Sequence, residues 1–258
     1  MVKSQQTKQA GFTLVELAIV MIIIGLLIGG VLKGQQLITN AQITATVAQI
    51  KSIDAATTSF KDQYNGMPGD LLAPTTRLSN CAAAPCSVAG DGDGKVDNAG
   101  ASITFAAAAA GEQLAYWAQL NAAGLLTGLN PAAANTFWGG NYPSSKINGG
   151  GFDIGWNAGN AVITNQSGGV AANVGTGHYL ALHGTANAAV GNTAPDAFMT
   201  ANQAMRIDTK IDDGITNTGT VLAAGVPAGA AGCQSAVAGA YNEAVAGATC
   251  SLYIKFQN

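Results

Sequence analysis

The feature that most constrains this chain is an apolar run near its start, from Phe12 to Leu32, which carries one charged residue, Glu16. As a helix, a run of this length rises about 31 Å, enough to cross the hydrocarbon core of a bilayer. Lys3 and Lys8 precede the run, and the positive-inside rule places them on the cytoplasmic side. A lone carboxylate in a spanning segment costs about 2.5 to 3.5 kcal/mol on insertion scales and usually has a partner. We therefore expect a membrane helix, with the rest of the chain facing outward, in which Glu16 has a specific role.

The residues at the start of this run, Gly11, Phe12 and the Thr-Leu-Val-Glu that ends at Glu16, resemble the prepilin cleavage and methylation motif of type IV pilins and type II secretion pseudopilins. The resemblance implies that residues 1–11 are a leader peptide and that a prepilin peptidase cuts between Gly11 and Phe12. It also implies that Glu16 meets the amino-terminal cation of processed Phe12 in a neighbouring subunit. Such a pairing is physically reasonable because a low-dielectric bundle strengthens the attraction and penalises an unmatched carboxylate. The alternative is an ordinary signal anchor with a stray glutamate.

Glycines within the run favour close packing against other helices. Gly25 and Gly29, and then Gly30 and Gly34, form two small-xxx-small pairs, which let neighbouring backbones approach each other in an apolar bundle. Many type IV pilins carry a proline near this depth, whereas this chain has Lys33 and the glycine cluster. Glycine is a poor helix former, so Gly29-Gly30 is expected to be the weakest point of the helix.

The helix is expected to continue well beyond the apolar run, because no proline interrupts the chain between Phe12 and Met67. Asn65-Gly66 followed by Pro68-Gly69 predicts its end. The sequence therefore divides into a transmembrane or filament-core helix at 12–32, an amphipathic continuation at 33–65 and an outward globular domain at 66–258. A stripe at spacings of three and four predicts the buried face of the continuation: Ile43, Val47, Ile50, Ile53, Thr57, Phe60 and Tyr64.

Composition indicates β structure in the outward domain. The chain has 258 residues, of which 48% are hydrophobic and 10% charged, with 34 glycines, which suggests short strands and tight turns. A short helix that presents Leu114, Trp117 and Leu120 and a second helix that begins near Pro195 are also expected. The predicted fold is α+β and pilin-like, with an antiparallel sheet packed on the amphipathic helix. Strands are predicted at Phe152–Trp156, Ala161–Thr164, Tyr179–Leu182, Val221–Ala223 and Leu252–Phe256.

Four cysteines allow three complete pairings. The sequence-local pairing, Cys81 with Cys86 and Cys233 with Cys250, is favoured because each bond closes a short loop. Four unrelated buried thiols are the alternative for an exported chain. The sequence contains no Cys-x-x-Cys, so neither a redox motif nor a zinc ribbon is supported.

Two acidic stretches are candidate calcium sites, calcium being the one cofactor that the sequence suggests. The first supplies Asp91, Asp93 and Asp97 with glycines between them, but lacks the spacing and the terminal glutamate of an EF-hand. A solvated turn is the alternative for this stretch. The second lies at the expected end of a helix, where carboxylates oppose the dipole and need compensation from a cation or from protein donors. Its carboxylates are Asp208, Asp212 and Asp213.

Charge and motifs disfavour nucleic acid binding and catalysis. From Gly66 onward six basic residues face eleven acidic ones, so no nucleic acid partner is expected. His178 and His183, the two histidines, are five positions apart on a predicted strand and would point to opposite faces. The sequence has no G-x-S-x-G, P-loop or H-E-x-x-H motif, and we expect a protein that is not an enzyme.

Three functions remain open. The first is a structural subunit of a type IV pilus-like filament that serves adhesion, motility or surface contact. The second is a pseudopilin of a type II secretion system, and the third is a membrane-anchored binding domain that does not polymerise. The first two imply a helical homo-oligomer, a prepilin peptidase and an inner-membrane assembly platform as partners. They place the chain in the inner membrane before assembly and then in an extracellular filament or a periplasmic pseudopilus.

Overall fold

The computed structural model divides the chain into two compact units, Met1–Ala41 and Gln42–Asn258. Helix α1 (Leu14–Tyr64) begins in the first unit and ends in the second. The leader peptide expected at 1–11 and the Gly11–Phe12 junction lie outside the described residues. The structure describes residues 13–97, 111–132, 137–147, 149–159, 162–163, 172–173, 175–184, 197–225, 232–235, 237 and 239–257.

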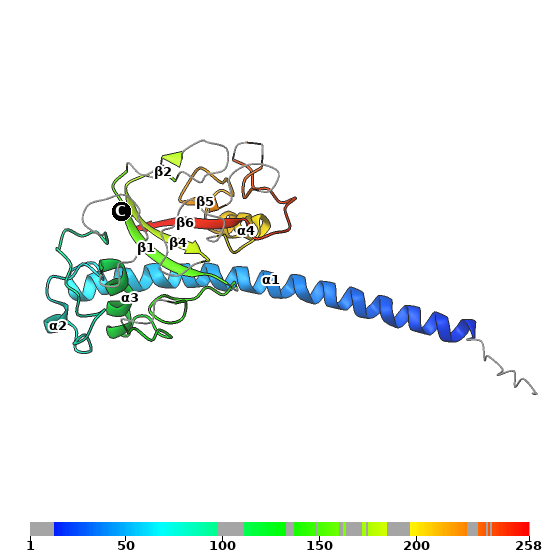
Figure 1. The fold of residues 1–258 in the computed structure, drawn as a ribbon, viewed down its shortest axis with the longest axis horizontal. Coiled ribbons are helices and arrows are strands. Elements are labelled where there is room, and N and C mark those ends of the chain that lie inside the picture. Colours follow the sequence, from blue (N-terminus) through cyan, green and yellow to red (C-terminus); the bar gives the residue numbers. More distant parts are fainter. Residues whose placement is uncertain are drawn as a thin grey trace, which may run out of the picture. The chain divides into compact units, whose positions relative to one another are not determined.

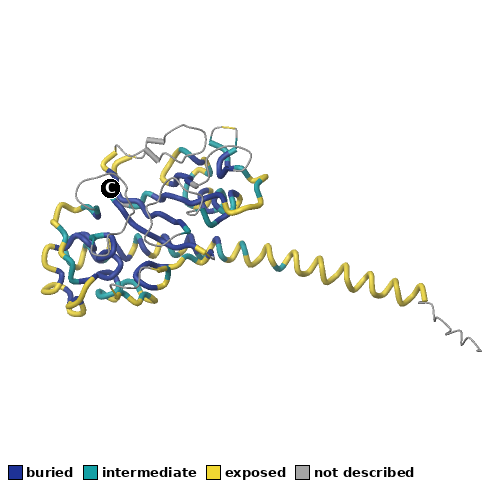
Figure 2. The backbone as a smooth tube through the Cα atoms, in the orientation of Figure 1, coloured by how far each residue is buried: buried dark blue, intermediate teal, exposed yellow. Residues whose placement is uncertain are grey.

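In the first unit, α1 is a continuous and exposed apolar helix. Every described side chain from Thr13 to Lys33 is exposed in the single chain (Figure 2). The helix passes through Gly29-Gly30 without interruption. Within the described part of the chain, α1 is the one helix long and apolar enough to cross a membrane.

In the second unit, α1 carries the predicted buried stripe. Its end also matches the prediction: Asn65, directly after Tyr64, has a left-handed backbone with φ of 46°. Asparagine tolerates this conformation better than most residues, so it can end a helix. Tyr64 itself is half-buried and packs against the core. The buried residues of the stripe are Ile43, Thr46, Val47, Ile50, Ile53, Ala56, Thr57 and Phe60.

A four-stranded antiparallel sheet forms the centre of this unit, with the strand order β1-β4-β6-β5 (Figure 1). Its strands are β1 (Gly151–Asn157), β4 (Gly177–His183), β5 (Val221–Gly225) and β6 (Cys250–Gln257). Each contains one of the predicted strands and is two or three residues longer. A separate two-stranded sheet pairs β2 (Val162–Ile163), within the predicted strand at 161–164, with β3 (Ala172–Asn173), for which no strand was predicted.

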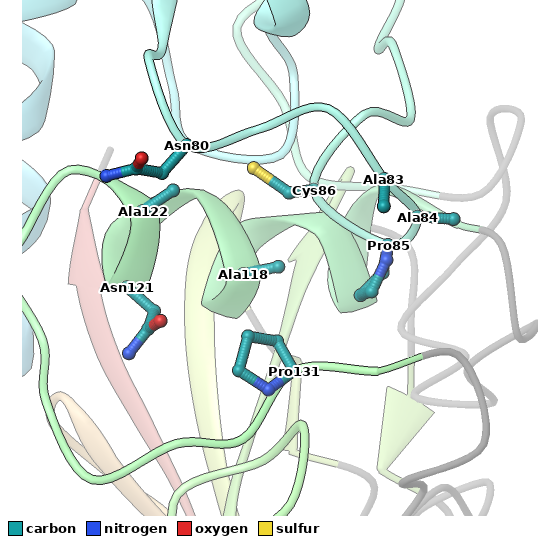
Figure 3. Close-up of a pocket in the computed structure, with 9 residues that line it drawn as sticks. All are labelled: Asn80, Ala83, Ala84, Pro85, Cys86, Ala118, Asn121, Ala122 and Pro131. Carbon is teal, nitrogen blue, oxygen red and sulfur yellow. The ribbon is translucent and has the colours of Figure 1, made fainter.

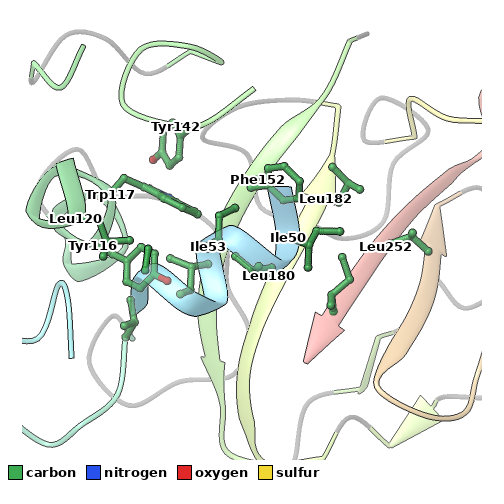
Figure 4. Close-up of a cluster of buried hydrophobic side chains, with 14 of the residues drawn as sticks. Ile50, Ile53, Tyr116, Trp117, Leu120, Tyr142, Phe152, Leu180, Leu182 and Leu252 are labelled. Atoms are coloured by element: carbon green, nitrogen blue, oxygen red, sulfur yellow. The ribbon is translucent and has the colours of Figure 1, made fainter. Parts of the chain in front are cut away.

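The main core lies where one face of the sheet meets the helices (Figure 4). Ile50 and Ile53 of α1 pack there beside Leu180 of β4. Helix α3 (Glu112–Ala122) is buried on all sides from Gln113 to Leu120, so the predicted single buried face was too narrow. The Tyr116 hydroxyl lies 2.5 Å from the Thr57 hydroxyl and ties α3 to α1.

The other face of the sheet carries a smaller buried cluster that contains Tyr179, Ala181 and Tyr253. Asp153 of β1 lies opposite Ala181 in the register and is fully buried. Its Oδ1 accepts a hydrogen bond from the Ile154 N–H at 2.8 Å, whereas its Oδ2 has no partner among the described residues. Burial raises the pKa of Asp153 to about 8, so this face holds a carboxyl group that is protonated at neutral pH.

Helix α4 (Ala201–Ile211) begins later than expected. The prediction of a start near Pro195 was wrong, because Thr200 and Gln203 form a capping box that defines the first turn. Phe198 precedes the helix, and its N–H donates to the Cys250 carbonyl oxygen at 3.2 Å. One further short helix, α2, spans Pro74–Arg77.

Two disulfides close loops of the second unit. Cys81 is bonded to Cys86, and Cys233 is bonded to Cys250 at the start of β6. This is the sequence-local pairing. The second bond joins the segment after β5 to the first residue of β6, the inner strand that pairs with β5.

Candidate assembly helix and carboxylate sites

The first turn of α1 holds Glu16 in a capping box. The Thr13 N–H and hydroxyl both donate to Oε2 of Glu16, at 2.9 and 2.8 Å, and the Glu16 N–H donates to the Thr13 hydroxyl oxygen at 3.3 Å. These bonds satisfy backbone groups that a helix start leaves unpaired. Oε1 of Glu16 has no hydrogen-bond partner within the described residues. In a single chain, Glu16 therefore caps its own helix and keeps one oxygen for another donor.

The glycines of α1 have the free space that close helix packing requires. A Cβ built on Gly25, Gly29 or Gly30 would meet no atom within 4 Å, and the same holds for Gly34. Because these positions are small and open in one chain, a second backbone can approach there. The structure thus offers the surface on which the predicted packing depends.

In the second unit, the loop at residues 91–97 is held almost entirely by side chains. All seven of its backbone N–H groups donate to titratable side chains. Glu112 accepts from the first and the last, at 3.3 and 2.9 Å, and Asp70 accepts from Gly92 and Gly94 at 2.6 and 2.7 Å. The other three N–H groups donate to side chains of Asp91, Asp93 and His178.

The backbone of this loop explains its glycines. Gly92 and Gly94 have φ of 79° and 84°, a left-handed conformation that glycine adopts without a steric penalty. This conformation turns both N–H groups toward the same carboxylate, Asp70. Burial raises the pKa of Glu112 to about 7 and that of Asp70 above its usual range. The loop is therefore fastened by acids that burial makes easier to protonate.

The structure corrects the first predicted calcium set. Asp93 is paired with Lys95, and the carboxylates gathered within 4.8 Å of one another are Asp70, Asp91 and Glu112. Asp97 takes part through its backbone N–H. The structure gathers Asp70 and Glu112 around Asp91 in place of Asp93 and Asp97, because acceptors 22 and 15 residues away in the sequence bind the backbone of this loop. The local sequence pattern of this loop is its glycines between the aspartates, and this pattern predicts a turn.

The second predicted set, Asp208, Asp212 and Asp213, does come together within 4.8 Å, and we call it the α4 carboxylate cluster. Asp208 is fully buried and accepts from the Tyr241 hydroxyl at 2.8 Å and from the Gly214 N–H at 3.2 Å. Burial raises the pKa of Asp208 to about 6.

The other two carboxylates of the α4 carboxylate cluster also have protein donors. The N–H groups of Thr220 and Val221 donate to Asp212, and the N–H of Ile215 and the hydroxyl of Thr218 donate to Asp213. Protein donors thus supply the compensation that the sequence predicted at this helix end. The outward lone pairs of these oxygens are of the type that calcium binds.

The two histidines occupy separate environments on β4. His178 accepts the Val96 N–H through Nε2 at 3.2 Å, and burial lowers its pKa to about 4. His183 is fully buried at the other end of the strand against the Trp138 ring, and burial lowers its pKa to about 3. Both are neutral at physiological pH and they share no site.

A small cavity of about 230 Å³ lies between the Cys81–Cys86 loop and α3 (Figure 3). Asn80 and Asn121 contribute its polar side chains, and Pro85 and Pro131 contribute apolar rings. None of its described lining residues is charged, so among them there is neither a general base nor a nucleophile with a base beside it.

Comparison with known proteins identifies the start of the chain. Residues 6–32 match the family model of the prokaryotic N-terminal methylation motif, the prepilin-type cleavage signal of type IV pilins and pseudopilins. Neither the curated proteins nor the solved structures gave a match. The motif, the long apolar helix and the four-stranded antiparallel sheet together define a pilin-like α+β protein with a prepilin signal. They support a type IV pilin or pseudopilin, which is anchored in a membrane before assembly.

Proposed function

We propose that this chain is a structural subunit of a type IV pilus-like filament that serves adhesion, motility or surface contact. A prepilin peptidase cuts between Gly11 and Phe12, the subunit waits in the inner membrane, and an assembly platform there adds it to the filament. The subunit performs no catalysis. The alternative within this class is a pseudopilin of a type II secretion system.

The observation that carries the proposal is the exposed apolar helix behind a prepilin signal. From Leu14 to Lys33 no side chain is buried by the rest of the chain, although almost all are apolar. Such a surface needs a cover, which is lipid while the subunit is stored and other copies of the same helix after assembly. A heterologous contact that does not close on itself gives a filament.

We propose that Glu16 sets the axial alignment of neighbouring helices when lipid is replaced by other copies of the helix. Its carboxylate is held in the first helical turn by Thr13, directly beside the position where cleavage creates the new amino terminus. In the low dielectric of a bundle, the amine of processed Phe12 in a neighbouring copy is the partner we propose for it. A copy that inserts out of register leaves the carboxylate unpaired and is disfavoured.

A substitution at Glu16 tests the filament role. Glu16→Val should leave the protein inserted and processed but lower the amount of filament recovered by shearing cells. Asp62→Ala, an exposed acid at the other end of the same helix, is the matched control and should assemble normally. Normal filaments from Glu16→Val would contradict the role of Glu16.

The size and surface of the outward domain favour a pilus over a pseudopilus. Residues 66–258 are rich in Ala, Gly, Asn and Thr, which suits a domain that displays area to the exterior. Electron microscopy of sheared surface material, combined with mass spectrometry, separates the possibilities. Long fibres composed mainly of this chain would support the pilus. Their absence would favour the pseudopilin, and an unprocessed solitary chain would favour a membrane-anchored binding domain.

A further inference from the structure

The exposed part of α1 carries two residues of opposite charge, Glu16 and Lys33. Between Leu14 and Ile50 the only charged residues are Glu16 and Lys33, and both are exposed in the single chain. An uncompensated charge within an apolar bundle is strongly unfavourable, whereas opposite charges attract most where the dielectric is low. If this surface is covered by other copies of the helix, each charge needs a partner there.

The two side chains cannot pair within one chain. Seventeen residues separate them, which corresponds to about 26 Å along the helix axis and about 100° around it. Glu16 and Lys33 therefore face different neighbours, and neither can reach the other in the same helix.

Copies stored side by side in one bilayer cannot form the pair either. Parallel copies with the same insertion hold Glu16 at one depth and Lys33 at another, again about 26 Å apart. A copy displaced along the axis by this amount brings its Lys33 level with the Glu16 of the copy beside it. Such a displacement exists only after subunits have left the plane of the membrane.

We infer that Lys33 forms an ion pair with Glu16 of a second, axially displaced copy of this chain in the assembled filament. This inference rests on the proposed function, because it needs a filament of parallel helices. Each subunit gives Glu16 to one neighbour and Lys33 to another, so the contact is heterologous and continues along the fibre.

The free oxygen of Glu16 makes the pair chemically accessible. Thr13 donates to Oε2, while Oε1 is left without a described partner and can accept an ammonium proton. A carboxylate has enough lone pairs to receive both the Lys33 ammonium of one copy and the amino terminus of another.

The test compares substitutions at Lys33 with a matched one elsewhere on α1. Lys33→Glu places like charges together and should reduce sheared filaments about tenfold or more, while membrane level and processing stay unchanged. Lys33→Arg keeps the charge and should assemble. Lys51→Glu, the same change at an exposed position beyond the apolar segment, should assemble as well. Wild-type filament levels from Lys33→Glu would overturn the inference.

Cryo-electron microscopy of the wild-type filament gives a second and independent readout. We expect the Lys33 ammonium within hydrogen-bond distance of Glu16 in another copy. Wild-type filaments in which Lys33 lies away from every neighbouring Glu16 would overturn this inference alone. A wild-type chain that forms no filament would overturn the proposed function together with it.

Discussion

Replacing Asp153 by asparagine should stabilise the protein in a way that depends on pH. Burial raises the pKa of Asp153 to about 8 from an ordinary value of 3.8. Below the lower value both folded and unfolded chains carry the proton, so the site has no effect. Between the two values only the unfolded chain ionises, and the wild type loses about 1.4 kcal/mol of unfolding free energy per pH unit. The full shift corresponds to roughly 5 to 6 kcal/mol at pH 8, an upper limit because water that enters the site would lower the pKa in the folded state.

The structure indicates that asparagine fits the same place. Its amide oxygen can keep the 2.8 Å bond from the Ile154 N–H, and its amide nitrogen replaces an oxygen that has no described partner. Urea unfolding of the mature chain in nonionic detergent, followed by tryptophan fluorescence, measures the difference at pH 4.5, 6 and 7.5. The gain of Asp153→Asn over wild type should grow with pH. A difference that stays constant over this range would refute the reasoning, and Asp62→Asn, at an exposed site, is the control.

Other predictions concern the loops of the second unit and its carboxylates. Replacing both cysteines of the Cys233–Cys250 bond by serine should lower the unfolding free energy by about 3 kcal/mol, against about 2 for the Cys81–Cys86 bond, because the closed loop is longer. Equal losses in urea unfolding would contradict the loop-length argument. Calcium should shift the melting temperature little, because protein donors already satisfy the α4 carboxylate cluster. A rise of several degrees on adding calcium, reversed by a chelator, would show that the cluster binds the ion.

The parts of the fold that depend on local pattern were predictable from sequence. The stripe from Ile43 to Phe60 repeats at helical spacing, and Leu252 and Ile254 alternate as a strand does, so both elements were predicted close to their observed bounds. The start of α4 was wrong because the capping box at Thr200 outweighs the signal of Pro195. The short strand β3 has only two residues and leaves no periodic pattern.

The residues of the candidate sites also differ in whether the sequence alone reveals them. Glu16 could be found from sequence because a carboxylate within an apolar run is conspicuous without any tertiary information. Asp70 and Glu112 could not, since each stands about 20 residues from the loop that it holds and only the fold brings them together. The burial of Asp153 also depends on which face of the sheet is covered, and this is a property of the whole domain.

The strand order has a consequence for when the sheet can be completed. β6 lies between β4 and β5 and is the strand that both of them pair with, although it follows them in the chain. Until β6 is available, β5 has no partner in the sheet and β4 is paired with β1 alone, so the sheet stays incomplete. If the chain is the filament subunit proposed above, its apolar helix holds the unfinished chain at the bilayer during this interval, so that folding is completed beside the membrane.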